Sequence, residues 1–226
     1  IDNLDKLNSL TLEDKDSKFT LALEKGDWVL KERNNFPVDN KKLGDLLVSL
    51  SRIQKVESKT SLESRYNRLD LQSLNSNKES RIKKLVFLDK NDNELLNLSI
   101  GKRKFTLGSD EGGTYVLFPD DPQVWLVTGE LNPGVRVRDW VDRKLINIKN
   151  EQIQKVTLIH PDGERVIVER SSSSNEYLFI RDIPNGKEPI RESITDEIGR
   201  TLSNLMFDDV MDASSITFPI DRTIKA

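Results

Sequence analysis

The chain carries the same succession of patterns twice, and this apparent duplication constrains its fold more than any other feature. The later copy runs from Ile153 to Ala213 and reads I-Q-K-V-T-L-I-H, a P-D-G turn, E-R-V-I-V-E-R, a serine-rich gap, E-Y-L-F-I and an apolar helical pattern. The earlier copy, Leu10 to Ser58, is built around S-L-T-L, a charged turn, K-F-T-L-A-L-E, a short gap, W-V-L and a leucine-rich helical pattern. Each helical pattern holds an apolar residue followed by glycine (Leu43-Gly44 and Ile198-Gly199). We therefore predict one ancestral β-β-β-α unit used twice.

The residues of the first copy indicate its elements. Apolar and polar residues alternate around Leu10–Leu12 and Phe19–Leu23, which predicts a hairpin, and Trp28–Leu30 gives a third short strand. Asp39 stands where a helix N-cap belongs. The helix that follows has one apolar stripe, formed by Leu43, Leu46, Leu47 and Leu50. Such a helix is expected to cover one face of a sheet.

Further strands are expected between the two copies, at 82–88, 94–100, 115–118 and 124–127, and Val135–Ile148 is predicted to be a short helix that ends in an extended connector. The predicted fold class is α+β, with antiparallel β-hairpin sheets each covered by a helix and a repeated β-β-β-α unit. We expect residues 1–150 to form the first unit with a β-hairpin extension, and residues 151–226 to form the second. Thr223–Lys225 is expected to begin a third unit.

Charge and composition exclude several classes of protein. The formal net charge is −3 and basic residues are spread among acids, so a dedicated nucleic-acid surface is not expected. Two short basic clusters, Arg81–Lys84 and Lys102–Lys104, are interpreted as solvated strand edges. The chain has no cysteine, which excludes disulfides and thiolate chemistry. It also has no apolar run near the roughly 18 residues of a membrane span.

Three segments resemble sites of known chemistry without completing them. Asp89–Asn93 copies the start of a calcium loop, but the sixth and twelfth loop positions hold Glu94 and Ile100 in place of glycine and glutamate. The glycine-rich loop at Gly108–Gly113 lacks the G-K-[ST] ending of a phosphate-binding loop. His160, the only histidine, precedes a tight turn with no marked catalytic partners. We interpret the first two as hairpin loops and His160 as exposed.

Acidic pairs and tryptophans remain as candidates for function. The carboxylates of Asp120-Asp121 and Asp208-Asp209 are expected to point apart on the surface rather than to act as an acid–base pair. The three tryptophans are either core anchors or stacking platforms for sugars, and strand patterns favour the core for Trp28 and Trp125. We therefore assign no catalytic residue, no cofactor and no metal.

The run R-V-R-D-W-V-D-R-K-L-I-N-I…I-Q-K-V-T-L-I-H-P-D-G-E-R-V-I-V-E-R, within Val135–Arg170, resembles the bacterial domain of unknown function 4340 family (DUF4340). The segments G-D-W-V-L, F-P-V-D with its leucine helix, and Y-V-L-F…V-W-L-V are also similar to that family. The similarity covers most of residues 10–170, and the second copy extends it to about residue 213. One departure is Arg65–Leu69, R-Y-N-R-L, which lacks the glycine of the family's K-Y-G-L segment.

This resemblance implies a protein held to the inner membrane by one N-terminal helix, expected to precede Ile1, with this domain on the periplasmic side. It also implies a genetic association with ABC-type transport or gliding-like components, and it carries over no catalytic residue. We therefore expect a non-enzymatic, extracytoplasmic accessory domain that binds protein partners through exposed strand edges. The alternative is an envelope glycan- or small-ligand-binding module that uses Trp140 or the 108–113 loop. A hydrolase with acidic catalytic residues is the third hypothesis.

Overall fold

The structure is a computed structural model, and it describes residues 4–75, 80–105, 112–170, 177–181, 183, 185–188, 190–191, 193–201 and 203–215. The chain divides into two compact units, Ile1–Asp142 with Asp209–Asp212, and Arg143–Asp208 with Ala213–Ala226. The boundary between the units after Asp142 falls within Val135–Ile148, for which the sequence predicted a short helix that ends in an extended connector. No helix of the described residues is long and apolar enough to span a membrane.

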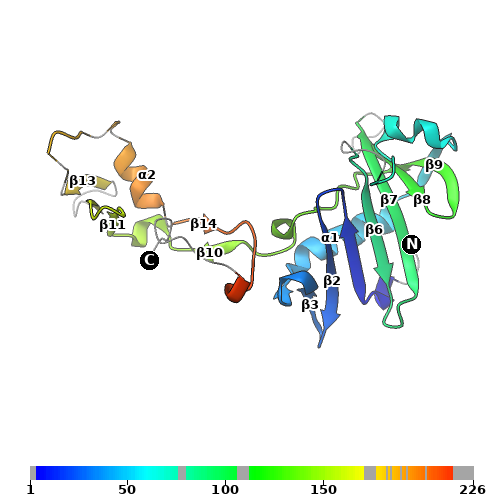
Figure 1. Ribbon diagram of the computed structural model, residues 1–226, viewed down its shortest axis with the longest axis horizontal. Helices are drawn as coiled ribbons and strands as arrows, with labels where there is room; N and C mark the ends of the chain where they lie inside the picture. The colour runs from blue at the N-terminus through cyan, green and yellow to red at the C-terminus, as the bar shows by residue number, and fades with distance from the viewer. Residues whose placement is uncertain are drawn as a thin grey trace. The chain divides into compact units, whose positions relative to one another are not determined.

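The first unit is built on one nine-stranded antiparallel sheet with the strand order β4-β3-β2-β1-β6-β7-β8-β9-β5 (Figure 1). Its strands are β1 (Ser9–Glu13), β2 (Lys18–Glu24), β3 (Asp27–Leu30), β4 (Phe36–Pro37), β5 (Lys55–Thr60), β6 (Lys83–Leu88), β7 (Glu94–Lys104), β8 (Gly113–Phe118) and β9 (Asp121–Thr128). Its helix is α1 (Asn40–Arg52), and its 3₁₀ turns are Leu4–Lys6, Lys31–Arg33, Glu63–Leu69 and Val137–Asp139.

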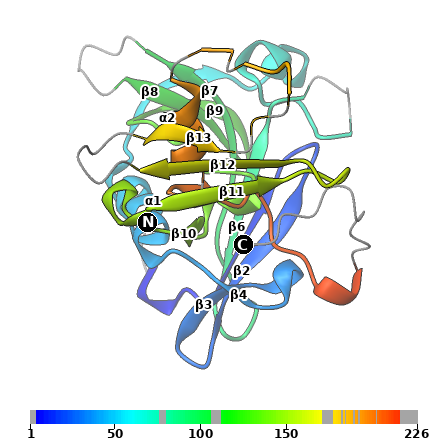
Figure 2. The same ribbon diagram turned by 90° about the vertical axis from the view of Figure 1, so that its left-hand side faces the viewer.

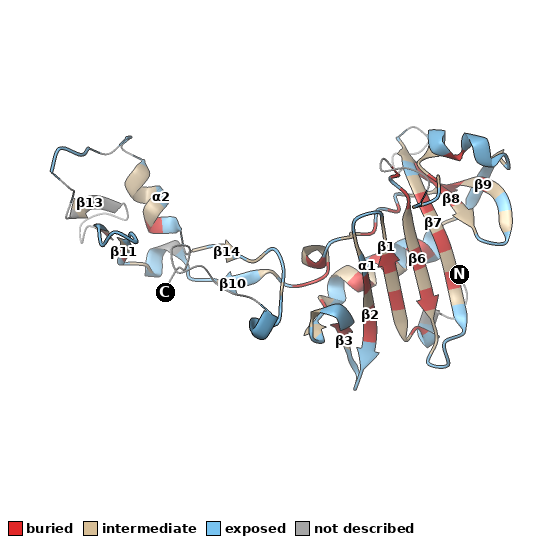
Figure 3. Ribbon diagram, viewed as in Figure 1, coloured by how far each residue is buried: buried red, intermediate tan, exposed pale blue. Residues whose placement is uncertain are grey.

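Alternation along the strands gives this sheet one buried face. Leu10 and Leu12 of β1 are buried while their neighbours are half-buried, and the same alternation runs along β6 and β7 (Figure 3). The register places Leu10 beside Leu21 of β2 and Phe87 of β6, so the apolar residues share a face. The predicted hairpin β1–β2 and the strand β3 are confirmed.

The helix α1 forms where the sequence predicted it. Asp39 is its N-cap, and the Asp39 carboxylate accepts a hydrogen bond from the backbone N–H of Lys41. Its apolar stripe buries Leu43, Leu46 and Leu50 while the opposite side stays in solvent. The helix ends at Arg52, before an extended residue that leads into the edge strand β5.

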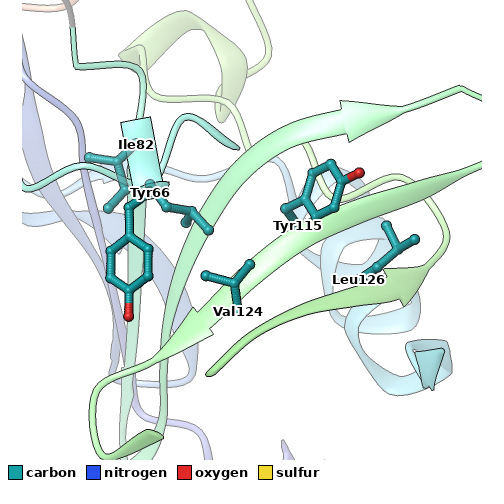
Figure 4. Packing of buried hydrophobic residues seen from close by; sticks show 6 residues of the cluster. Tyr66, Ile82, Tyr115, Val124 and Leu126 are labelled. Carbon is teal, nitrogen blue, oxygen red and sulfur yellow. The ribbon is translucent and has the colours of Figure 1, made fainter. Parts of the chain in front are cut away.

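A satellite cluster closes the end of the sheet where Glu63–Leu69 packs, and its members come from four separate segments (Figure 4). They are Tyr66, Leu71, Ile82, Tyr115, Val124 and Leu126. The Tyr66 hydroxyl donates a hydrogen bond to the backbone carbonyl of Pro122, which satisfies the one polar atom of that buried ring. Burial raises the pKa of this hydroxyl.

The second unit contains a three-stranded sheet, β11-β12-β13 (Figure 2), and a separate two-stranded pair, β10-β14. Its elements are β10 (Lys144–Ile146), β11 (Lys155–Ile159), β12 (Arg165–Arg170), β13 (Tyr177–Arg181), α2 (Ile194–Arg200) and β14 (Leu205–Met206), with 3₁₀ turns at Asn150–Gln152 and Ala213–Ser215. Helix α2 contacts all three strands of the larger sheet. Val156 and Val168 lie directly opposite each other and are both buried, so they anchor this small core.

The prediction of an α+β fold with a repeated β-β-β-α unit is wrong. The described part of the chain is mostly β, with 39% of its residues in strands and 22% in helices. Strands β1–β3 do not form a sheet of their own, because β1 also pairs with β6 along its whole length, from Ser9 opposite Leu88 to Glu13 opposite Lys84. They are therefore one end of the nine-stranded sheet, and the chain after α1 returns to its other edge as β5. Leu202 and Thr223–Lys225, on which the repeat also drew, lie outside the described residues.

An ion pair ties residues 209–212 to the first unit, and it makes a testable prediction. The Arg33 guanidinium donates from Nε and Nη2 to the two carboxylate oxygens of Asp209, at 2.7 and 3.0 Å. This hydrogen bonding holds the pKa of Asp209 below its usual value. The pair therefore stabilises the folded state fully above the unfolded pKa of about 3.9, and this stabilisation is lost as the pH falls through the lower folded pKa.

We expect the Arg33→Gln substitution to raise the pKa of Asp209 toward its ordinary value. An NMR titration of the Asp209 carboxyl carbon measures this shift, and Asp208, whose carboxylate pairs with Arg143, serves as the internal control. An Asp209 titration that is the same in both proteins would show that Arg33 does not hold this carboxylate in solution.

Candidate functional site

A groove in the first unit runs along α1, between this helix and the segment 128–134. It consists of two adjoining hollows of about 450 and 310 Å³ that share Ser49, Glu130 and Leu131. We call it the α1 groove. The residues that α1 contributes recur at helical spacing on one side of the helix: Lys42, Asp45, Leu46, Ser49, Arg52 and Ile53. Asp139 and Trp140 lie at the larger hollow and Arg103 at the smaller one.

The walls of the larger hollow are held together by hydrogen bonds to the backbone. The Lys42 ammonium donates to the carbonyl of Val141 at 2.8 Å, and the backbone N–H of Asp39 donates to the carbonyl of Trp140 at 2.7 Å. The Trp140 indole N–H donates to the carbonyl of Gly134 at 2.8 Å. A Cβ on Gly134 would lie 2.2 Å from the Cβ of Asp139, so this close turn requires glycine. These contacts hold residues 134–141 against α1.

Lys83 of β6 binds the segment 128–134, which forms one wall of the groove. Its ammonium donates to the side-chain carbonyl of Asn132 and to the backbone carbonyl of Pro133. Burial lowers the pKa of Lys83, and the nearby acids Asp14 and Asp139 oppose that effect. Lys83 thus acts on the groove as a structural cation bound to two oxygens.

The charged groups of the groove are mostly engaged with one another or with the backbone. Arg103 pairs with Glu130 through Nη1 at 2.5 Å, Asp45 pairs with Lys41 at 2.7 Å, and the Asp139 carboxylate accepts from the backbone N–H of Arg136. The groove also offers apolar surface from Leu46, Leu131 and Pro133. Such a mixture of apolar walls and a few placed polar groups suits the binding of a ligand.

The sequence did not predict this groove, although Trp140, which it offered as a ligand-binding residue, lies at the larger hollow. Its two walls lie about eighty residues apart in the sequence, and α1 reads from its sequence as an ordinary amphipathic helix. A further signal was the P-G pair at Pro133-Gly134, which marks a tight turn but does not indicate what the turn faces.

Two of the three segments that resemble known sites lie in turns of the structure. Asp89–Asn93 forms the β6–β7 turn, in which the Asp89 carboxylate accepts hydrogen bonds from the Asn91 and Asn93 N–H groups and from the Asn93 side-chain amide. These bonds, first of all that of the Asn93 side chain, lower the pKa of Asp89. His160 is exposed in the β11–β12 turn, as predicted. Residues 108–111 of the glycine-rich loop lie outside the described residues, and Gly113 begins β8.

The acidic pairs do not form facing carboxylates. Asp121 accepts hydrogen bonds from the Trp125 indole and the Gln123 backbone, which lower its pKa, while Asp120 is exposed. Asp208 and Asp209 bind different arginines. In the part of the chain that the structure describes, no group of three or more acidic or histidine side chains could hold a metal ion.

The tryptophans occupy different environments. Trp140 is only 3% exposed and Trp28 is half-buried in β3. Trp125 is half-buried in β9, where the Lys55 ammonium lies 4.5 Å from the centre of its ring. Although Trp140 contributes to the α1 groove, its ring is too deeply buried to be a platform for a sugar.

The edges of the two sheets differ in how far they are protected against pairing with another chain. Edge strand β4 has two residues, one of them Pro37, which has no N–H to donate. Edge strand β5 has two register irregularities against β9 and carries the charges of Lys55, Glu57 and Lys59. Edge strand β11 pairs with β12 in a regular register over five residues. Of these three edges, β11 is the one without a bulge or a proline.

Comparison with known proteins gave one family. A family model described as "Domain of unknown function (DUF4340)" matches residues 28–219. No curated protein and no solved structure gave a match.

Proposed function

The chain belongs to the domain of unknown function 4340 family, and from that premise we propose that it is a non-enzymatic interaction domain whose β11 edge adds a strand from a partner protein. We further propose that it works outside the cytoplasm, anchored to the inner membrane, and that its partners are components of an ABC-type transport system. The observation that carries the proposal is the regular edge of β11, which pairs with no strand but β12 among the described residues.

The hydrogen bonds at both ends of the β11–β12 pair show which backbone groups face outward. His160 N–H donates to Glu164, and Arg170 N–H donates to Gln154. Hydrogen-bonded pairs alternate with non-bonded pairs in an antiparallel ladder, and the register is unbroken between these ends. The backbone groups of Val156 and Leu158 therefore face β12, whereas those of Lys155, Thr157 and Ile159 face the open edge.

The side chains beside this edge suit an added strand. Lys155 and Thr157 are exposed and Ile159 is 63% exposed, whereas Val156 is buried. A partner strand would bond its backbone to the outward groups and place alternate side chains beside these three residues. Covering Ile159 would also remove apolar surface from water.

A proline at position 157 tests the proposal. The N–H of Thr157 faces away from β12, so Thr157→Pro removes this N–H without removing a hydrogen bond to β12. Proline is tolerated at such a position of an edge strand. We expect at least a tenfold loss of partner binding, since a missing hydrogen bond and a blocked strand together exceed about 1.4 kcal/mol. The matched control is Thr157→Ala, which keeps the N–H and is expected to bind as the wild type does.

The measurement is native purification of the full-length protein from membranes under mild crosslinking, with quantification of what co-elutes. Transporter subunits recovered in stoichiometric amounts with wild type and Thr157→Ala, but not with Thr157→Pro, are the expected result. Equal recovery with Thr157→Pro would overturn strand addition at β11. Recovery of the protein alone, whatever the variant, would overturn the transport association.

A further inference from the structure

Arg103 has a guanidinium edge that its own ion pair does not use. The Arg103–Glu130 contact is made by Nη1, which leaves the edge formed by Nε and Nη2. Arg103 Nε is buried, and it has no hydrogen-bond partner among the described residues. Buried donors are nearly always paired in folded proteins, so this N–H is available to an acceptor from outside the described residues, either water or a ligand.

A break in the β7–β8 ladder accompanies the placement of this side chain. The pairing of β7 with β8 is irregular between Ile100 and Arg103. Such irregularities re-aim side chains, and here Arg103 lies at the smaller hollow of the α1 groove while Lys102 beside it is exposed. The cluster Lys102–Lys104 is therefore more than a solvated strand edge.

A second arginine lies at the same hollow of about 310 Å³. Arg52, in the last turn of α1, is exposed and has no acidic partner within ion-pair distance in the described ranges. The ionised side chains that line the hollow are Arg52, Arg103 and Glu130, so their formal charges sum to +1. One added negative charge would balance them.

We propose that this hollow binds a carboxylate group, held by the Nε–Nη2 edge of Arg103 and by the guanidinium of Arg52. The planar edge of arginine matches the two oxygens of a carboxylate. The ring of Phe105, which is itself 76% exposed, lies 4.8 Å from the Arg103 guanidinium. The site is independent of the β11 edge, which belongs to the other unit.

The carboxylate has two possible sources, a small organic acid or the C-terminus of a polypeptide, and one experiment separates them. The Arg103 Nε–H resonance of the ¹⁵N-labelled full chain is followed by NMR while acetate, a four-residue peptide with a free C-terminus, or the same peptide amidated is added. We expect a saturable shift with both carboxylates and none with the amide. Tighter binding of the free peptide than of acetate identifies a polypeptide source, and equal affinity identifies a small acid.

Variants decide whether the site is the one proposed. Arg52→Gln is expected to weaken carboxylate binding about tenfold, the factor that corresponds to the loss of one charge-assisted hydrogen bond of about 1.4 kcal/mol. Arg103→Lys keeps the charge beside Glu130 but removes the planar edge, and it is expected to abolish saturable binding, followed through the Arg52 Nε–H resonance. The matched control, Lys102→Gln, is expected to change the affinity less than twofold. Three results would each overturn the proposal. One is the absence of a shift at 50 mM acetate or peptide, a concentration on the order of a weak dissociation constant. The others are an equal shift with the amidated peptide and an equal loss of affinity in Lys102→Gln.

Discussion

Replacing Phe87 with alanine is expected to destabilise the first unit by about 3–5 kcal/mol. Phe87 is fully buried in β6, where it lies opposite Leu10 of β1 and Leu96 of β7. Removal of its ring leaves a cavity at the centre of a nine-stranded sheet, and the neighbouring strands cannot close in without breaking their ladders. The effect is measured by urea denaturation followed through tryptophan fluorescence, since Trp28, Trp125 and Trp140 all lie in this unit.

The matched control for this substitution is Val86→Ala. Val86 is the preceding residue on the same strand, it is half-buried, and its side chain points to the other face of the sheet. We expect it to cost about 1 kcal/mol or less, because a half-exposed valine loses little buried area. If Phe87→Ala were no more destabilising than Val86→Ala, β6 would not lie at the centre of the core.

The same experiment tests the continuity of the nine-stranded sheet. Trp28 of β3 and Trp125 of β9 lie near opposite ends of its strand order. In the observed sheet both strands are parts of one ladder, so we expect the signals of the two rings to change at the same urea concentration. Single-tryptophan variants report each ring. Two separate transitions would contradict the continuous sheet.

Local elements of the fold were predictable from local chemistry. The hairpin β1–β2 follows from alternation on both sides of a charged turn, and the N-cap at Asp39 follows from a carboxylate placed just before an apolar stripe. The β6–β7 turn follows from the Asp and Asn residues at 89–93. In each case the residues that decide the structure lie within a few positions of one another.

The pairing of strands that lie far apart in the sequence was not predictable, and the predicted fold class was wrong for this reason. Nothing in the sequence of β1 says that its second neighbour is β6, some seventy residues later, because alternation specifies a buried face and leaves the partner open. Similar short patterns in two halves of a chain are therefore compatible with one continuous sheet. The α1 groove and the unpaired edge of Arg103 were missed for the same reason, since they depend on which segments meet.

Gly101 is the position where such a meeting of distant segments has the sharpest consequence. A Cβ at Gly101 of β7 would lie 2.1 Å from the backbone carbonyl oxygen of Leu69 and 2.8 Å from Cγ of Leu71. The chain after the 3₁₀ turn Glu63–Leu69 thus lies directly on β7, at the irregularity of the β7–β8 ladder. We expect Gly101→Ala to destabilise the first unit by about 3 kcal/mol, at the upper end of the usual cost of overpacking, because backbone has to move.

Gly44→Ala is the matched control for Gly101→Ala, and its expected effect has the opposite sign. Gly44 lies inside α1, and a Cβ there would meet no atom within 4 Å. Alanine at this position should therefore stabilise the unit by about 0.5–1 kcal/mol, because glycine loses more backbone entropy on folding into a helix. Both are measured by the urea and fluorescence experiment described for Phe87. The same added methyl group would then have opposite effects on stability at Gly44, which has open space beside it, and at Gly101, against which a distant segment packs. If Gly101→Ala were neutral, the residues around Leu69 would not lie on β7, and the cluster around Tyr66 would have to pack in another way.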